Sequence, residues 1–576
     1  MIRKITGYLG EYKKYAILTP IIMLGEVIME VFIPFVMAAI IDKGIQGNGG
    51  ITYTVKLGFI MISMALLSLF FGAVGGKFAA KAGMGFAKNI RKALFEKVQD
   101  FSFANVDKFS TASLVTRLTT DVTNMQNAFM MIIRMGIRAP FMLIGALIMT
   151  LTISQKLSTV FLVAVPVLGI SLIFIIRKAF PRFQEMLNKY DSMNASVQEN
   201  LVNIRVVKAF VREKYEKQKF EASADSVRKA QVLAEKVVIL SMPIMQLTMY
   251  GTIVAIIWLG GRMAIGGELA IGQLSSFISY VTQILMSLMM LSMIFVILVI
   301  SRASISRIVE VLDEEIDVKD ENPNSSVEME NASVEYKNVS FSYAKKDGNL
   351  VLENINFQIH SGETIGIIGG TGSAKTTLVQ LIPRLYDVLK GEVIVGNHNV
   401  KEYTLKHLRE EVAMVLQKNV LFSGTISENI KWGNESATEE EIVDACKAAQ
   451  AHDFIMSFPK GYETDLGQGG VNVSGGQKQR LCIARALLKK PKILILDDST
   501  SAVDTATDAN IRKIFKEQLR ETTTLIIAQR ISSVQDADRI LVIDDGKINA
   551  FAAHEELLRT NNIYREVYES QQKGEN

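Results

Sequence analysis

The sequence predicts an all-α membrane domain with six spanning helices and cytoplasmic helical extensions, followed by an α/β domain. Hydrophobic residues make up 49% of the 576 residues, which is high for a wholly soluble chain, and they concentrate before residue 302. From Val334 onward, short strand-like runs alternate with helical ones, as in α/β domains with parallel strands. We expect the membrane domain over residues 1–312, an acidic, proline-containing linker over 313–332 and the α/β domain over 333–576.

Six apolar stretches account for the spanning helices. A membrane helix needs about 20 mostly apolar residues to cross the hydrocarbon. The candidates are Tyr15–Ile41, Leu57–Gly76, Ala139–Gln155, Leu157–Ile176, Val237–Gly261 and Leu269–Ser301. The third is slightly short, and we expect it to extend backward through Phe129–Ile137.

The distribution of lysine and arginine predicts the orientation. Lys4, Lys13 and Lys14 precede the first span, and the connections after the second and fourth spans are rich in basic residues. The other connections are short and poor in them. Both termini are therefore expected in the cytoplasm. Met1–Lys14 has no short apolar core with a cleavage site, so we expect no removable signal peptide.

The two basic connections are long and have a helical pattern. Phe86–Val98, for example, mixes charges with apolar residues at helical spacing and contains no proline. We expect the spans to continue into the cytoplasm as a stalk. Two small cytoplasmic helical hairpins are the alternative.

Some charged and soft side chains within the spans are candidate functional residues. Glu26 lies about ten residues, or ~16 Å, into its span, where a carboxylate is costly and often functional. The alternative is that Glu26 and Glu30 face water or pair with a neighbouring helix. Arg134 and Arg138 share one helix face and are expected at the inner membrane surface, in contact with lipid phosphate or in structural pairs. Methionines recur in the last two spans, and they suit either an adaptable substrate cavity or ordinary packing; they are Met242, Met245, Met249, Met286, Met289, Met290 and Met293.

Net charge says little about the class of protein, whereas the cysteines disfavour two kinds of site. A net charge of +4 is small for this length and argues neither for nor against nucleic acid. Cys446 and Cys482 are the only cysteines and lack CxxC spacing, so neither a disulfide framework nor a zinc site is expected.

A glycine-rich segment follows an apolar strand-like run that begins at Glu363. Such a loop binds phosphates through backbone N–H groups and a helix N-terminus, while a lysine reaches the β and γ oxygens. The predicted nucleotide-binding residues are Gly369, Gly370, Gly372, Ser373, Ala374, Lys375, Thr376 and Thr377, and Thr376 is also expected to bind Mg²⁺. Ala374 stands where the GxxxxGK[ST] pattern has its second glycine. If φ is positive there, the Cβ costs about 1 kcal/mol, which ATP binding should survive.

Two further segments belong with this loop. Lys492–Asp498 is an apolar strand ending in two carboxylates, and Asp497 is placed to bind Mg²⁺. Val473–Arg480 opens a helix with small residues and exposed N–H groups, which suits an anion.

Ser474, Gly475, Gly476 and Gln477, followed by Asp497, resemble the signature and Walker B motifs of the ATP-binding-cassette (ABC) family. With six preceding spans, the chain resembles the exporter-type half-transporters over essentially its whole length. The resemblance implies that Tyr343 stacks on adenine, that Gln417 contacts Mg²⁺ and the attacking water, and that Ser501–Asp504 signals across a dimer. Taken singly, Tyr343 fits a packing residue and Gln417 a surface glutamine. Phe103–Ser110 and Val202–Ala209 match the family's two coupling helices.

Two positions depart from active family members. The catalytic glutamate after the Walker B aspartate is replaced by Asp498, which is one methylene shorter, and misplacement by ~1 Å can cost about 10²-fold in rate. The switch histidine is replaced by Gln529, whose amide can hydrogen-bond a γ-phosphate but lacks imidazole's protonation chemistry.

Asp498, Gln529 and Ala374 all belong to the nucleotide site that is built from this chain's own Walker motifs, which we call its Walker side. The signature motif, in contrast, has the family's residues. Family members sandwich two ATP molecules between the Walker motifs of one chain and the signature of the other. The asymmetry therefore indicates a heterodimer with a second, non-identical half-transporter, in which this chain holds the degenerate site. An active homodimer with Asp498 as a weak base, and a regulatory half that binds ATP without turnover, are the alternatives.

The sequence indicates the transported compound less clearly than it indicates the ATP site. Six spans per half and helical stalks resemble exporters, and amphiphilic, drug-like compounds are the leading cargo, followed by lipids or peptides. No peptidase domain precedes the first span, which disfavours a peptide-processing exporter. The spans exclude soluble cassette ATPases that act on DNA or ribosomes, so we expect no nucleic-acid partner and a multi-pass location in the cell membrane.

Overall fold

The computed structural model describes residues 2–322, 325–344, 349–498 and 504–575, and the chain divides into two compact units. The first comprises Met1–Gln99 and Thr111–Glu314; the second comprises Asp100–Ser110 and Glu315–Asn576. The predicted fold class, six membrane helices followed by an α/β region, is confirmed. The segment Asp100–Ser110, which we expected in the membrane domain, belongs to the second unit.

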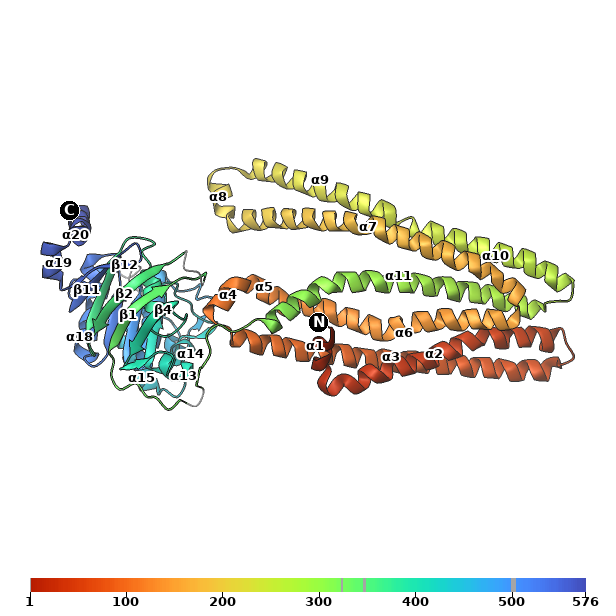
Figure 1. Cartoon of the computed structure of the whole chain (residues 1–576), viewed down its shortest axis with the longest axis horizontal. Coiled ribbons are helices and arrows are strands. Elements are labelled where there is room, and N and C mark those ends of the chain that lie inside the picture. The colour runs from red at the N-terminus through yellow and green to blue at the C-terminus, as the bar shows by residue number, and fades with distance from the viewer. Residues whose placement is uncertain (1, 323–324, 345–348, 499–503, 576) are drawn as a thin grey trace. The chain divides into compact units, whose positions relative to one another are not determined.

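The first unit is built from long helices, drawn from red to green in Figure 1. Their bounds are α1 Ile2–Thr6, α2 Lys13–Ala39, α3 Gly50–Gln99, α5 Thr111–Thr116, α6 Val122–Ile153, α7 Gln155–Val202, α8 Ile204–Ala209, α9 Glu213–Val238, α10 Ser241–Ile265 and α11 Ile271–Asp313. A 3₁₀ helix occupies Gly7–Tyr12, and π-helical turns occupy Ile40–Ile45 and Arg117–Asp121. Within the described residues, six helical stretches are long and apolar enough to cross a membrane, as predicted.

The spans continue as helical extensions. α3 is one helix of 50 residues, which at 1.5 Å per residue is ~75 Å long, more than twice the ~30 Å of a bilayer core. α7 has 48 residues and runs side by side with α9 (Figure 1). The alternative of two separate helical hairpins is therefore wrong.

One predicted span is interrupted. A turn at Ile239–Leu240 separates α9 from α10, so the apolar run Val237–Gly261 is not a single helix. Pro243 lacks the N–H that would donate to the carbonyl of Ile239, and its ring disfavours helix at that point.

The second unit contains two larger sheets. Strands β2-β1-β4-β5 form one, and β12-β11-β3-β10-β9-β6 form the other. The strand bounds are β1 Val334–Phe341, β2 Leu352–Ile359, β3 Thr364–Gly369, β4 Lys390–Val395, β5 His398–Asn399, β6 Val412–Val415, β9 Ile493–Asp497, β10 Thr523–Ile527, β11 Arg539–Asp544 and β12 Lys547–Ala552; β7 Gly424–Thr425 pairs separately with β8 Asp465–Leu466. Every residue of β9 and β10 is buried, as expected for central parallel strands covered on both faces.

Helices complete this unit. They are α4 Phe103–Phe109, α12 Lys375–Gln380, α13 Leu405–Glu411, α14 Ile426–Lys431, α15 Glu439–Ala448, α16 His452–Met456, α17 Gly475–Leu488, α18 Thr505–Gln518, α19 His554–Thr560 and α20 Asn562–Glu575, with short 3₁₀ helices at Gly461–Glu463 and Ile531–Ser533.

Candidate functional site

The parallel strands bring four predicted segments to one edge of the six-stranded sheet. In register, Ile527 of β10 lies beside Ile367 of β3 and Asp497 of β9, and Val415 of β6 lies beside Leu496 of β9. The carboxyl ends of these strands therefore align. The glycine-rich loop, Asp497, and the segments carrying Gln529 and Gln417 all follow at that edge, where ligands bind in open α/β sheets.

The glycine-rich loop is folded around Lys375. Its Nζ donates to the carbonyls of Gly369 and Gly370, each at 2.8 Å, and lies 3.4 Å from Ser373 Oγ. Burial lowers the pKa of Lys375. Gly372 and Ala374 both have positive φ, 85° and 71°, so Ala374 is indeed a non-glycine residue in a left-handed position.

Thr376 of α12 and Asp497 of β9 are in direct contact. Thr376 Oγ1 donates to Asp497 Oδ1 at 3.0 Å, and Asp497 is almost fully buried. Burial raises the pKa of Asp497, and the hydrogen bond from Thr376 opposes that rise. Mg²⁺ that is bound to a nucleotide prefers oxygen ligands, and the Thr376 hydroxyl and the Asp497 carboxylate supply two such oxygens. Lys375 lies beside them.

Asp498 and Gln529 are paired directly. Gln529 Nε2 donates to Asp498 Oδ2 at 2.6 Å, and Asp498 N donates to the carbonyl of Ile527 at 3.1 Å. Asp498 has a φ of 48°. The two residues that depart from the family pattern, Asp498 and Gln529, are therefore hydrogen-bonded to each other.

Gln571 in α20 is a further residue of the site that no sequence motif predicts. Its Nε2 donates to the carbonyl of Gln529, and its Oε1 accepts from Ile531 N, both at 2.8 Å. Gln571 thus holds the switch segment from both sides. A polar residue in a C-terminal helix carries no local motif that would have revealed this.

Tyr343 combines packing with exposure. Its ring meets Phe341 and Tyr386 edge-on at 4.8 and 5.1 Å between centroids, and its hydroxyl lies 2.9 Å from Thr377 Oγ1. The side chain is nevertheless 49% exposed. A partly open ring tied to the phosphate loop is compatible with adenine stacking as well as with packing.

Gln417 is exposed beyond the end of β6. Ser474 and Gln477 form a capping box at the start of α17: Ser474 N donates to Gln477 Oε1 at 2.8 Å, and Gln477 N donates to Ser474 Oγ at 3.3 Å. Ser474 and Gly475 are exposed. Across the described ranges, no hydrogen bond or ion pair joins this signature segment to the glycine-rich loop, so the structure does not bring them into direct contact. Asp504 caps α18 by accepting from Thr507 N at 2.9 Å, whereas 501–503 lie outside the described residues.

The two segments expected to serve as coupling helices each contain a short helix. α4 belongs to the second unit, where Tyr386 donates to Asp107 Oδ2 at 3.0 Å and meets Phe103 at 6.1 Å between ring centroids. α8 belongs to the first unit and buries none of its side chains there.

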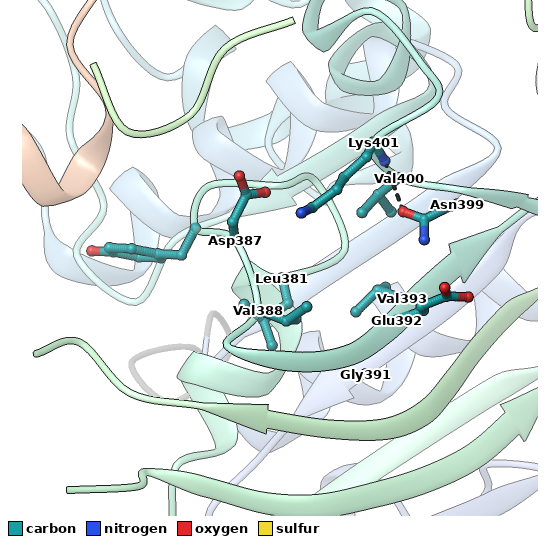
Figure 2. A pocket seen from close by; sticks show the side chains of 10 residues that line it. Leu381, Asp387, Val388, Gly391, Glu392, Val393, Asn399, Val400 and Lys401 are labelled. Atoms are coloured by element: carbon teal, nitrogen blue, oxygen red, sulfur yellow. Dashed lines mark hydrogen bonds between the residues drawn. The ribbon is translucent and has the colours of Figure 1, made fainter. Parts of the chain in front are cut away.

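A cavity of about 160 Å³ lies elsewhere in the second unit. Figure 2 shows Asp387, Glu392 and Lys401 among its lining side chains. Its lining contains none of the predicted nucleotide-binding residues, so we assign it no part in the site.

Glu26 and Glu30 on α2 pair with a neighbouring helix. Arg138 of α6 lies 3.2 Å from Glu26 and 2.8 Å from Glu30. The pairing alternative is confirmed. The structural pair expected for Arg138 is confirmed as well.

Comparison with known proteins agrees with this architecture. Residues 17–309 match the family model described as "ABC transporter transmembrane region", and residues 352–501 match that described as "ABC transporter". The chain is 38% identical over 570 residues to the uncharacterized ABC transporter ATP-binding protein YfiB of Bacillus subtilis (strain 168), covering 99% of this chain and 98% of that protein. It is 32% identical over 494 residues to the ATP-dependent lipid A-core flippase of Desulfotalea psychrophila (strain LSv54 / DSM 12343), covering 85% of each.

A bacterial Atm1-family ABC exporter solved with ATP bound shares the fold, with a TM-score of 0.82 and 24% identity over 97% of this chain and 98% of that one. Fold and site together define a membrane half-transporter with its own nucleotide-binding domain. The chain belongs to the ABC transporter family and has the ATP-driven exporter architecture.

Proposed function

We propose that this chain is the degenerate-site subunit of a heterodimeric exporter in the cell membrane, with both termini in the cytoplasm. Its Walker motifs bind ATP but turn it over slowly. Its signature completes the competent ATP site of a non-identical partner. The cargo is an amphiphilic, drug-like compound.

The phosphate-loop edge fits Mg²⁺-ATP. Lys375 would hold the β and γ oxygens, Thr376 and Asp497 would bind Mg²⁺, and Tyr343 would cover adenine. The hydrogen bond of 3.0 Å between Thr376 and Asp497 supports this assignment, because it holds a hydroxyl and a carboxylate oxygen close together. Gln417, at the same sheet edge, would approach the metal and water.

The hydrogen bond from Gln529 to Asp498 carries the proposal. A general base must reach a water proton with a free oxygen. Here Oδ2 accepts at 2.6 Å from an amide that cannot exchange protons as imidazole does. The shorter side chain withdraws the carboxylate as well, and misplacement of about 1 Å costs about 10²-fold in rate.

The exposed signature supports a role in trans. Ser474 and Gly475 are open to solvent at the start of α17, so an anion can reach this helix N-terminus, where the N–H groups of Ser474 and Gln477 are used by the capping box. Exposed apolar side chains around α8 support a partner as well: Val202, Val206, Phe210 and Val211 are all exposed. Surfaces of this kind are typical of protein contacts.

ATP hydrolysis by the purified full chain tests the proposal. We expect turnover about 10²-fold below that of the heterodimer. The double substitution Asp498→Glu with Gln529→His should raise turnover of the chain alone at least about tenfold, because it restores a base of full length and an imidazole. Lys375→Ala serves as the background control. Robust turnover by the unaltered chain without a partner would favour the homodimer and overturn the proposal; ATP binding without any stimulation of a partner would favour the regulatory half.

A lipid is the second candidate cargo. The observation that favours it is the relative named ATP-dependent lipid A-core flippase. Flipping of labelled lipids by the heterodimer in vesicles, compared with efflux of amphiphilic dyes, separates the two.

A further inference from the structure

The switch segment, residues 529–533, is held to its domain by a side chain rather than by the sheet. Ala528 N still donates to the carbonyl of Ile367 at 3.2 Å, but within the described ranges no backbone hydrogen bond involves Gln529. Gln571 of α20 binds the chain there instead: its Nε2 donates to the carbonyl of Gln529 and its Oε1 accepts from Ile531 N, both at 2.8 Å. Only one orientation of the amide satisfies both groups, so this contact fixes the main chain at two points that are two residues apart.

The packing of α20 sets the position of Gln571. Tyr564 is fully buried in an apolar core that also contains Ile531. Val567 and Tyr568 are partly buried against the same core. Tyr564, Val567 and Tyr568 precede Gln571 by seven, four and three positions, so all of them share one face of the helix with it. Gln571 is therefore the polar end of the face with which α20 packs, and its amide reaches the switch segment from a fixed position.

Gln529 depends on this contact because its own side chain is exposed. Ordering a residue costs backbone and side-chain freedom, and here the backbone is already fixed where the side chain pairs with Asp498. The Gln529 amide donates to Asp498 Oδ2 at 2.6 Å, while Gln571 holds the carbonyl of the same residue. Because both hydrogen bonds of Gln571 go to main-chain atoms, it would hold position 529 in the same way whichever side chain stood there.

A second contact holds the same segment at its other end. Ser533 Oγ donates to Asp508 Oδ2 of α18 at 3.1 Å, and the same oxygen also accepts from Arg512 Nε at 3.3 Å. Ser533 lies four residues beyond Gln529. Its hydrogen bond therefore fixes the end of the segment rather than the residue that contacts Asp498.

We infer that Gln571 is a positioning residue of this chain's own ATP site. Its hydrogen bonds to the switch segment hold Gln529 against Asp498, so α20 keeps the carboxylate that should activate water occupied. The inference rests on the proposed function and deepens it, because it assigns the placement of the pair that slows turnover to a helix outside the nucleotide motifs. With glutamate and histidine at the two positions, the same contact would favour catalysis, since it would hold an imidazole with the accuracy that a reacting site needs.

Opposite effects of one substitution in two forms of the full chain test the inference. Gln571→Ala removes both hydrogen bonds to the switch segment. In the unaltered chain it should raise kcat for ATP about threefold, because Asp498 Oδ2 is released to accept a water proton. In the variant that carries Asp498→Glu with Gln529→His it should lower kcat at least about tenfold, because the imidazole loses its position. KM should stay unchanged in both forms, since the residues expected to bind ATP are untouched.

Ser533→Ala is the matched control, because it removes one side-chain hydrogen bond from the same segment without altering the contacts of Gln529. It should leave kcat unchanged in both forms. Gln571→Glu has the length of the native side chain and keeps the acceptor but not the donor, so it should act like Gln571→Ala while retaining the fold of α20.

The inference requires both changes in kcat. A fall in both forms, as general loosening would give, no change in either, or an equal response to Ser533→Ala would overturn it. Robust turnover by the unaltered chain alone would instead overturn the proposed function, and the comparison of Gln571→Ala with Ser533→Ala in the double variant would still decide the role of Gln571.

Discussion

Ala374 occupies a backbone position that suits glycine. Its φ of 71° and ψ of 22° are left-handed, where a Cβ costs about 1 kcal/mol. Ala374→Gly should therefore stabilise the loop locally, by up to about 1 kcal/mol. Hydrogen exchange of residues 364–381 in the full chain should slow by about fivefold.

Gly372→Ala is the matched reverse change, since Gly372 has a φ of 85°. It should accelerate exchange in the same segment. If both substitutions moved exchange in the same direction, backbone strain would not be the cause.

The partly buried Lys375 and the buried Asp497 predict a narrowed pH range for Mg²⁺-ATP binding. Burial raises the pKa of Asp497 above 3.8, so its carboxylate is protonated, and a metal ligand lost, at a higher pH than for an ordinary aspartate. Burial lowers the pKa of Lys375 below 10.5, so its positive charge is lost at a lower pH than usual. Affinity should fall at both ends, as titration calorimetry from pH 5 to pH 10 would detect. Without Mg²⁺ the acidic fall should disappear; if it persists, Asp497 is not the group responsible.

Local motifs could predict most of the candidate site. The glycine-rich loop, Asp497, Asp498 and Gln529 each follow a recognisable apolar strand, and the aligned strands then bring them together. Gln571 could not be predicted, because its contact with Gln529 spans 42 residues and depends on how α20 folds back.

At the scale of elements, one aromatic residue contributes both a hydrogen bond and a ring contact to α4. Tyr386 donates to Asp107 at 3.0 Å and packs against Phe103. Tyr386→Phe keeps the ring and removes the hydrogen bond, which is worth about 1 kcal/mol. Exchange of residues 103–109 should accelerate by about fivefold, while ATP affinity stays unchanged because the hydroxyl does not contact the phosphate loop.

Tyr403→Phe provides the control for that experiment. Tyr403 is buried and donates to the carbonyl of Val395 at 2.8 Å, away from α4. It should leave exchange of α4 unaltered. Equal acceleration in both variants would indicate general loosening of the unit and contradict the specific role of Tyr386.

Hydropathy predicted the six spans because the bilayer imposes length and composition on each helix separately. It could not identify the partners of Arg138, since the pairs with Glu26 and Glu30 depend on how the helices pack. It likewise missed the turn at Ile239–Leu240, because both residues are apolar and the break comes from Pro243.

For the whole molecule, the decisive question is whether its two nucleotide motifs serve two identical ATP sites or two different ones. The Walker side carries Ala374, Asp498 and Gln529, whereas the signature helix α17 begins with an intact capping box. In a heterodimer these motifs belong to different ATP sites and should respond differently to mutation. In a homodimer the two sites are identical, so every ATP lies between the Walker motifs of one copy and the signature of the other, and substitutions in either motif affect both sites.

Matched substitutions in this chain, within the complex with its partner, distinguish these cases. Lys375→Ala removes phosphate binding at the slow site, so ATP turnover of the complex should fall by no more than about fivefold. Gly475→Asp introduces a carboxylate at the exposed start of α17, where it repels the partner site's phosphates; loss of such anion stabilisation typically costs about 10²–10³-fold. Both variants should still assemble with the partner, as size-exclusion chromatography of the complex would show. Equal losses from the two substitutions would mean that both motifs act on one kind of site, and the heterodimeric division of labour would be wrong.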